Sequence, residues 1–446
     1  MTIVADFIHQ LEFDQLPDAV IAQTSRCVLD LCGVAAGGVT TQLSEIIRGH
    51  AAENFCSSGV SARMLFDGRR VSGPGAALAG GMTIDSLDAH DGHVLTKGHV
   101  GVTVFPVLLA LADCGRVNTG REFLAGLAMG YEVATRAGIA LHRTACDYHT
   151  SGAWNALAAA ALGARALGLD RCATREALGI AEYHGPRSQM MRCIDHPTMV
   201  KDGSGWGAMA GLSAAYLARS GFTGAPALTI EDPGVQDIWA DLGSRWLILD
   251  QYFKPYPVCR WAQPAVEAAL ALRRKHNLNV ADIRQVSVST FHQASRLATR
   301  FPKTTEQAQY SLPFSVAIAL SRGMLGAKEV GVEALADAQA LRLSSCMQVL
   351  EHEEYNQRFP AQRWAEVAFE LQDGTHLYSA ARTARGDPET AASDTEIAGK
   401  FSDLAVPVLG EVRAEDIRNG VAELAEDNQS LPRLLDLVLT GVPTAA

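Results

Sequence analysis

Ionisable side chains are concentrated in residues 82–99, MTIDSLDAHDGHVLTKGH, directly before an apolar run at residues 100–112. Such groups are costly to place beside a buried segment unless they are paired with one another or used in catalysis. The stretch therefore predicts an active site built on acid–base chemistry. The alternative is a helix end with capping aspartates and a buried histidine bound to the main chain. The groups concerned are Asp85, Asp88, His90, Asp91, His93, Lys97 and His99.

Apolar residues at helical spacing surround this stretch up to about residue 265. Residues 120–141 and 154–169 are rich in alanine and apolar on most faces, which is typical of helices buried in a helical core. Residues 201–219 predict another such helix, beginning at Lys201. An Asp-Gly turn within residues 62–71 predicts the one short hairpin of this part.

The pattern changes after Pro264. Residues 283–291 alternate like a half-buried strand. Residues 365–371 and 375–381 flank an Asp-Gly pair and predict a hairpin. A buried helix is expected at residues 311–325, between the strand at residues 283–291 and this hairpin.

The sequence thus predicts a mostly α protein with a smaller α+β domain. We expect a large all-helical domain made of residues 1–268 and 396–446, and an α+β lid domain at residues 269–395. The last fifty residues return to amphipathic helix and would dock back on the helical domain. A chain of 446 residues exceeds the size at which a single core stops growing, which favours two domains.

Composition excludes several classes of protein. The formal net charge of −11 disfavours nucleic acid and anionic membranes as partners. Nine scattered cysteines without a CxxC pair argue against a zinc ribbon, an iron–sulfur cluster and a disulfide framework. The apolar run at residues 100–112 is too short to span a bilayer, and the first ten residues lack the features of an export signal. We therefore expect a cytoplasmic protein with no membrane partner.

Eight segments in succession resemble the 2-methylcitrate dehydratase (MmgE/PrpD) family along nearly the whole chain. The first four are GGMTIDSLDAHD, GHVGVTVFPVLLALA, TGREFLAGLAMGYEVATRAG and YHTSGAWNALAAAALGARALGLD. The last four are MVKDGSGWGAMAGLSAAYLARSGFTG, FKPYPVC, AQYSLPFSVAIAL and GDPETAASDTEIAGKFSDLA. The order of the segments carries the resemblance.

The resemblance implies a helical domain plus a small α+β domain, a homodimer, and an active site in a cleft between the domains without metal or organic cofactor. Substrates would be small polycarboxylates, and the reaction would break a bond at a carbon next to a carboxylate. Removing a proton from such a carbon needs a placed base and a cationic group to stabilise the developing charge.

Three candidate catalytic residues occupy positions that match the family's motifs: His99, His149 and Lys201. Tyr148 is the fourth candidate; it stands where the resembled family usually has an apolar aromatic residue, so its phenol is an added proton donor. His149 lies before an expected helix start, which would favour a bound carboxylate. Lysine is disfavoured at a helix start, so Lys201 is either solvated or used in proton transfer, and the resemblance favours the second. The structural alternatives are a main-chain-bound histidine for His99, a core tyrosine for Tyr148 and an exposed side chain for Lys201.

Further residues are candidates for binding the substrate. Arg192 and Arg260 would clamp carboxylates, although each is also plausible as an ordinary ion-pair partner. The full set of predicted substrate-binding residues is Asp88, Asp91, Lys97, Arg192, Arg260 and Gln263.

Gln263 departs from the resembled family, whose dehydratases and decarboxylases typically carry histidine there. An amide exchanges no proton near neutral pH. We therefore predict a cofactor-independent epimerase or racemase of a small dicarboxylate or amino-dicarboxylate such as iminodisuccinate, with Lys201 opposite Tyr148 or His149. His93 or His292 could substitute for the histidine. The alternatives are a lyase of the 2-methylcitrate dehydratase or cis-aconitate decarboxylase type, and a non-catalytic polycarboxylate-binding protein.

Overall fold

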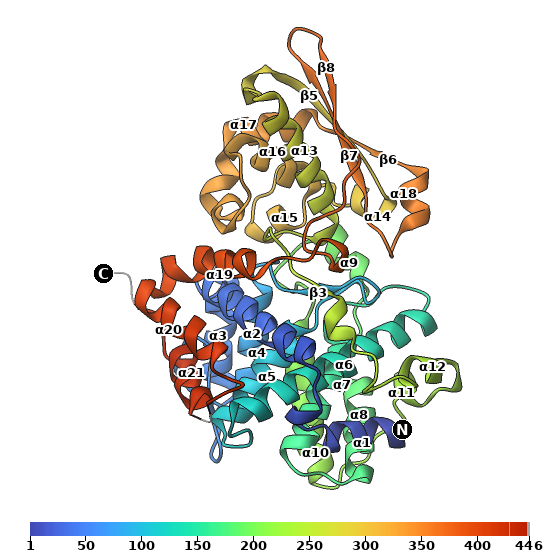
Figure 1. Ribbon diagram of the computed structural model, residues 1–446, viewed down its shortest axis with the longest axis vertical. Coiled ribbons are helices and arrows are strands. Elements are labelled where there is room, and N and C mark those ends of the chain that lie inside the picture. The colour runs from blue at the N-terminus through green and yellow to red at the C-terminus, as the bar shows by residue number, and fades with distance from the viewer. Residues whose placement is uncertain (428, 444–446) are drawn as a thin grey trace.

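The computed structural model describes residues 1–427 and 429–443, and it separates a larger helical domain from a smaller mixed domain (Figure 1). The mostly α architecture with a smaller α+β domain is confirmed. The first part of the chain forms α1 (Thr2–Gln10), α2 (Asp18–Gly38), α3 (Gln42–Asn54), α4 (Gly73–Asp85), α5 (Gly101–Asp113), α6 (Gly120–Thr144), α7 (Ser151–Ala166), α8 (Arg171–His184), α9 (Met190–Asp195), α10 (Ser204–Arg219), α11 (Leu228–Glu231) and α12 (Gln236–Trp239).

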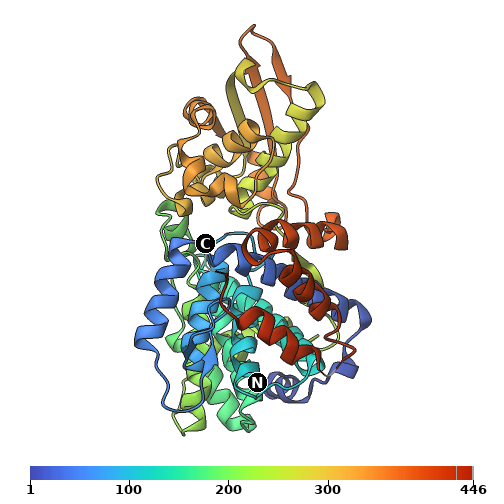
Figure 2. The same ribbon diagram turned by 90° about the vertical axis from the view of Figure 1, so that its left-hand side faces the viewer.

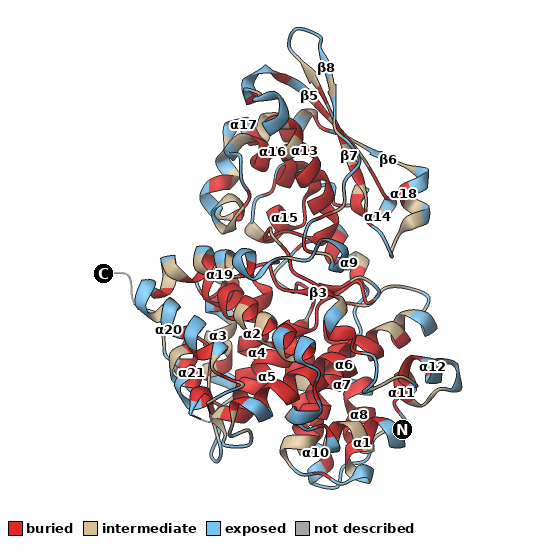
Figure 3. Ribbon diagram, in the orientation of Figure 1, coloured by how far each residue is buried: buried red, intermediate tan, exposed pale blue. Residues whose placement is uncertain are grey.

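Helices α5 and α7 form the centre of the helical domain. Every residue of α5 from Gly101 to Ala112 is buried, as is every residue of α7 from Ser151 to Ala164 (Figure 3). This burial explains why the two helices are apolar on most faces, because these residues do not meet solvent. Small residues let the neighbouring helices approach: a Cβ added at Gly211 of α10 would lie 2.1 Å from the Ala156 carbonyl oxygen of α7.

We predict that Gly211→Ala destabilises the protein by about 1–3 kcal/mol, because the added methyl group has no room against the main chain of α7. The control is Gly399→Ala, where the helix is exposed and no atom of residues 1–427 or 429–443 lies within 4 Å of the added Cβ. There alanine should be neutral or slightly stabilising. Denaturant unfolding of both variants makes the comparison, and an equal free energy of unfolding for the two would contradict it.

The last helices pack back on the first part of the chain. Gly33 and Gly37 of α2 meet Phe401 and Leu404 of α19, and Figure 2 shows the C-terminal helices beside α2. By length and composition alone α2 could cross a membrane, but 67% of its apolar window is buried inside the protein. These last helices are α19 (Asp394–Leu409), α20 (Glu411–Ala422) and α21 (Ser430–Leu439).

The small domain is a four-stranded sheet with helices packed against it. The strand order is β6-β5-β7-β8, with β5 and β6 parallel and the other pairs antiparallel. Its strands are β5 (Ile283–Thr290), β6 (Gln348–Glu351), β7 (Ala365–Leu371) and β8 (His376–Tyr378). Its helices are α13 (Gln263–His276), α14 (His292–Ser295), α15 (Thr305–Gln309), α16 (Leu312–Arg322), α17 (Ala338–Cys346) and α18 (Glu353–Arg358).

Alternating burial along β5 and β7 gives the sheet one core face. In the antiparallel register Val286 faces Phe369 and Val288 faces Val367, and all four side chains are buried. The strand predicted at residues 283–291 and the hairpin around residues 371–376 are confirmed. The boundary predicted between residues 268 and 269 falls inside α13, which packs as one helix against β7 and α16 of the small domain.

Short pairings complete the helical domain. The predicted hairpin at residues 62–71 is formed by β1 (Ala62–Arg63) and β2 (Arg70–Val71). A second pair, β3 (Gly92–His93) with β4 (Gln251–Tyr252), was not predicted. Only glycine fits at residue 92, since a Cβ there would lie 2.5 Å from the Tyr252 ring. This pairing brings the ionisable stretch of residues 82–99 beside the segment that follows β4.

Candidate active site

Two segments far apart in the sequence meet at a buried ion pair. Asp88 Oδ1 lies 2.5 Å from the ammonium nitrogen of Lys254, which also donates a hydrogen bond to the Asp88 carbonyl oxygen at 3.1 Å. The β3–β4 pairing explains the contact, because Lys254 follows β4 by two residues. Burial alone would raise the pKa of Asp88, but the ammonium groups of Lys254 and Lys201 outweigh it and lower that pKa. The carboxylate therefore stays ionised.

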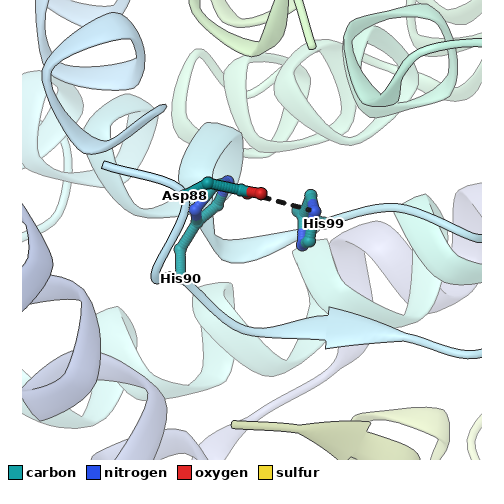
Figure 4. Close-up of side chains that lie close together, drawn as sticks. All are labelled: Asp88, His90 and His99. Carbon is teal, nitrogen blue, oxygen red and sulfur yellow. Dashed lines mark ion pairs between the residues drawn. The ribbon is translucent and has the colours of Figure 1, made fainter. Parts of the chain in front are cut away.

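His99 is held as a neutral imidazole beside this pair. Its Nδ1 lies 2.6 Å from the Asp91 carbonyl oxygen, so Nδ1 carries the hydrogen and Nε2 has the free lone pair. Nε2 lies 3.9 Å from Asp88 Oδ1, 3.8 Å from Asp202 Oδ2 and 3.5 Å from Lys254 Nζ. Figure 4 shows the Asp88 carboxylate directed at this ring. Burial, followed by the charge of Lys254, lowers the pKa of His99 to about 3.

Lys201 lies in a turn that precedes α10, so the prediction that a helix begins at this residue was wrong. The helix begins at Ser204, and Lys201 has a φ of 47°, a left-handed conformation that is uncommon for a residue other than glycine. Its ammonium group donates a hydrogen bond to Gln309 Oε1 at 2.6 Å and lies 4.7 Å from the centre of the Tyr310 ring. The same Gln309 oxygen accepts the N–H of Asp88 at 2.9 Å. The small domain thus closes directly over Lys201.

The start of α7 and the turn that precedes α10 support His99. Ser151 donates a hydrogen bond to Asp202 Oδ2 at 2.9 Å and accepts the His99 main-chain N–H at 3.0 Å. The close approach of α7 to the turn before α10 requires glycine at residue 152, because a Cβ there would lie 2.2 Å from the carbonyl oxygen of Gly203. Burial, followed by the charge of Asp88, raises the pKa of Asp202 to about 6.

Asp85 and His90 form a second buried layer behind His99. The His90 and His99 ring centres lie 4.4 Å apart, and His90 Nε2 lies 3.7 Å from Asp85 Oδ1. Among the residues that the structure describes, neither ring nitrogen of His90 and neither carboxylate oxygen of Asp85 has a hydrogen-bond partner. Burial, followed by the charge of Asp202, raises the pKa of Asp85 to about 7. Burial also lowers the pKa of His90, so both groups are held toward their neutral forms.

Comparison with known families decides what kind of protein carries this site. A sequence model of the MmgE/PrpD N-terminal domain matches residues 2–242, and one of the MmgE/PrpD C-terminal domain matches residues 256–426. The chain belongs to the MmgE/PrpD family. The two matched domains correspond to the order of segments on which the sequence resemblance depended.

Relatives of this MmgE/PrpD protein include lyases by name. It is 23% identical to the cis-aconitate decarboxylase-like protein oryM of Aspergillus oryzae, over 98% of this chain and 96% of that protein. It is 26% identical to cis-aconitate decarboxylase of Mus musculus, over 97% and 92% of the two chains. Identity to cis-aconitate decarboxylase of Homo sapiens is 28%, over 60% and 59%.

In the MmgE/PrpD chain, Tyr148 and His149 lie just before α7. The Lys97 ammonium nitrogen lies 4.2 Å from the centre of the Tyr148 ring. Nδ1 of His149 lies 3.2 Å from the Asp147 carbonyl oxygen. Arg192 is exposed on α9. Proton transfer by Tyr148 or His149 and substrate binding by Arg192 stay predictions.

Arg260 and Gln263 are bound to each other and to the main chain. Arg260 donates hydrogen bonds to Gln263 Oε1 at 2.8 Å and to Asp387 Oδ1 at 2.6 Å. The Gln263 amide donates to the carbonyl oxygens of Tyr256 and Val258 at 3.0 and 2.9 Å. Both side chains therefore brace the turn that follows Lys254. Contact of Gln263 with a substrate would require breaking these hydrogen bonds, so the geometry does not favour the substrate-binding role predicted for it. Arg260 Nε has no hydrogen-bond partner among the described residues, and substrate binding by Arg260 stays a prediction.

Asp91 lies behind the site, where Tyr131 donates a hydrogen bond to its Oδ2 and the Gly101 N–H donates to Oδ1 at 3.3 Å. Its side chain accepts the main-chain N–H of Gly101 at the start of α5, and its carbonyl oxygen orients His99. Burial raises the pKa of Asp91 to about 7, above an unfolded value near 3.8. The folded chain therefore binds a proton that the unfolded chain has lost, and the resulting stabilisation is present below about pH 4 and lost as the pH rises through 7.

We predict that D91N loses less stability than the wild type between pH 5 and pH 8, because an amide cannot lose this proton. The slope of the free energy of unfolding against pH should become shallower by at most about 1.4 kcal/mol per pH unit, the value for one proton. D403N, at an exposed position of α19, is the matched control and should keep the wild-type slope. Urea unfolding at several pH values measures these slopes, and parallel curves for D91N and the wild type would count against the prediction.

Several residues of the site were not predicted from the sequence. Lys254 and Asp202 lie within segments that carried the family resemblance, but a single lysine or aspartate there has no spacing signal of its own. Gln309 and Tyr310 belong to the small domain, and Ser151 reads as an ordinary helix start. Only the folded chain brings these residues together with His99.

Proposed function

We propose that this protein is a cofactor-independent enzyme that removes and returns a proton at a carbon next to a carboxylate of a small polycarboxylate. The observation that carries the proposal is one buried site holding both an unprotonated imidazole, His99, and an ammonium group, Lys201. The first can accept a proton once the negative charge of a bound polycarboxylate offsets the burial and the Lys254 charge that lower its pKa, and the second can donate one. An epimerase or racemase needs such a pair, because the proton leaves one face of the carbon and returns to the other.

The chemistry follows from the charges of the site. His99 Nε2 takes the α-proton, and the electron pair of the broken C–H bond moves onto the substrate carboxylate. No carboxylate of residues 1–427 or 429–443 lies within 4.0 Å of the Lys201 ammonium group, so its charge is available to that carboxylate. Lys201 then protonates the opposite face of the carbon. The imidazolium and the neutral amine that result are the form of the enzyme that runs the reverse reaction.

We propose a dicarboxylate or amino-dicarboxylate such as iminodisuccinate as the substrate of this epimerisation. Decarboxylation is the second candidate, and the names of the relatives favour it. In that reaction the bond to a carboxyl carbon breaks, carbon dioxide leaves with the electron pair staying on the carbon, and an ammonium group protonates that carbon. The two reactions share the substrate class and the proton donors, but they differ in their products.

Product analysis separates the two candidates. The purified enzyme is incubated with single stereoisomers of iminodisuccinate and, separately, with cis-aconitate and 2-methylcitrate. Formation of the other stereoisomer, detected by chiral chromatography, supports the epimerase. Release of carbon dioxide from cis-aconitate, or a new conjugated acid from 2-methylcitrate, at about one per second or faster would assign a lyase instead.

We predict that chelators leave the activity unchanged. One oxygen of Asp88 and one ring nitrogen each of His90 and His99 lie within 4.8 Å of one another, a spacing that could hold a metal ion. The Lys254 ammonium nitrogen, however, already lies 2.5 Å from Asp88 and 3.5 Å from His99 Nε2. A divalent cation there would be repelled by this charge. Loss of turnover in EDTA that a divalent metal restores would make these three side chains ligands.

A further inference from the structure

Arg363 is a small-domain arginine buried without an anionic partner. It is 5% exposed, and its Nη2 donates a hydrogen bond to the Val94 carbonyl oxygen at 3.2 Å. Its Nε and Nη1 have no hydrogen-bond partner, and no carboxylate lies within 4.0 Å, among residues 1–427 and 429–443. A buried cation with unsatisfied donors is costly unless a ligand completes it.

A second cation, Lys97, lies in the turn that contains this Val94 carbonyl group. Lys97 ends the turn of residues 94–97, and its main-chain N–H donates to the Val94 oxygen at 3.2 Å. The Lys97 backbone has a φ of 52°, and among the described residues its ammonium group contacts the Leu95 carbonyl oxygen at 3.5 Å and the Tyr148 ring. Burial, followed by the charge of Arg363, lowers the pKa of Lys97 to about 8. Arg363 and the Lys97 main chain thus meet at one carbonyl oxygen, and no carboxylate of residues 1–427 or 429–443 lies within 4.0 Å of either charged group.

Tyr252 connects this pair of cations to the catalytic cluster. The Arg363 guanidinium carbon lies 5.7 Å from the centre of the Tyr252 ring, and the His99 ring meets the same ring edge-on at 6.4 Å. His93, which precedes the turn, is 2% exposed, and its Nδ1 has no hydrogen-bond partner within the described part of the chain. Arg363 and His99 thus pack against the same aromatic ring, that of Tyr252.

We propose that Lys97 and Arg363 form the subsite for a second carboxylate of the substrate, the one remote from the reacting carbon. The proposal rests on the proposed function, since it places the reacting carboxylate at Lys201 and the remote one here. A guanidinium presents two parallel N–H donors to a carboxylate, and the ammonium group adds a point charge. The subsite selects compounds with two separated carboxylates. Because its two cations come from different domains, a bound diacid also holds the domains together.

Binding of an inert diacid tests the subsite without turnover. Isothermal titration compares succinate with its monoamide, succinamate, on the wild type, K97M and R363Q. We expect the wild type to bind succinate roughly 10- to 100-fold more tightly than succinamate, the range for one charge-assisted hydrogen-bonded contact. Each variant should lose most of this discrimination. The matched control is R358Q on α18, an exposed arginine of the same domain paired with Glu354, which should keep it.

The diacid-to-monoamide ratio separates substrate binding from a structural role. If Arg363 only ties the domains together, R363Q lowers the melting temperature and leaves the ratio unchanged, which overturns the subsite. Lys97 lies in the other domain and gives an independent variant should R363Q fail to fold. The subsite proposal is also overturned if the wild type does not bind succinate, or if the wild type and K97M bind succinate with equal affinity. Discrimination that depends on both residues without turnover of any tested polycarboxylate would support the subsite and refute the proposed function.

Discussion

Replacing Lys201 by alanine is expected to lower kcat by a factor of about 10² to 10⁴, the usual contribution of a positioned acid–base group. The ammonium group is the proton donor of the proposed reaction, and its one hydrogen bond within the described chain is to Gln309 Oε1. The fold should survive, since the side chain makes no ion pair within 4.0 Å among the residues described. Steady-state kinetics with the substrate found by product analysis measures the loss.

The control for this variant is K303A, an exposed lysine on the segment before α15. It should keep wild-type kcat and KM. A melting temperature for K201A close to that of the wild type shows that lost activity is not lost structure. If folded K201A retained more than roughly a tenth of wild-type turnover, well above the range for a lost acid–base group, Lys201 would not be the proton donor.

The second large effect is expected for His99→Asn. The asparagine amide can replace Nδ1–H and keep the hydrogen bond to the Asp91 carbonyl oxygen, but it removes the Nε2 lone pair. We therefore expect a fall in kcat of about 10² to 10⁴ with little change in KM. His196→Asn, at an exposed histidine beyond α9, is the control. Equal activity of H99N and the wild type would show that the imidazole only supports the loop.

The helical core could be predicted from the sequence because its signal is local and uniform. Helices α5 and α7 are apolar on every face, and the two-residue alternation of β5 marks one buried face of a sheet. By contrast, β3 and β4 are two residues each, too short for any periodicity. Strand β6 is largely exposed and so lacks alternation. Its place beside β5 is decided by main-chain pairing.

The candidate site was predictable in part for the same reason. The density of ionisable groups in residues 82–99 indicated Asp88 and His99, and both lie in the buried cluster. Lys254 reaches it through the β3–β4 pairing, and Gln309 reaches it by closure of the small domain, so neither contact has a local signal. Lys201 belongs to the cluster, but the reason given for it, a lysine at a helix start, was wrong because the helix begins three residues later.

The most direct test of the central claim, a proton removed on one face and returned on the other, is hydrogen exchange in deuterated water. Each stereoisomer of the substrate is incubated with the wild type, K201A and H99N, and NMR follows deuterium at the stereocentre. The wild type should label both isomers. Each variant keeps one of the two bases, so K201A should exchange only one isomer without inversion and H99N only the other. Inversion without deuterium uptake, or the same isomer exchanged by both variants, would contradict the account.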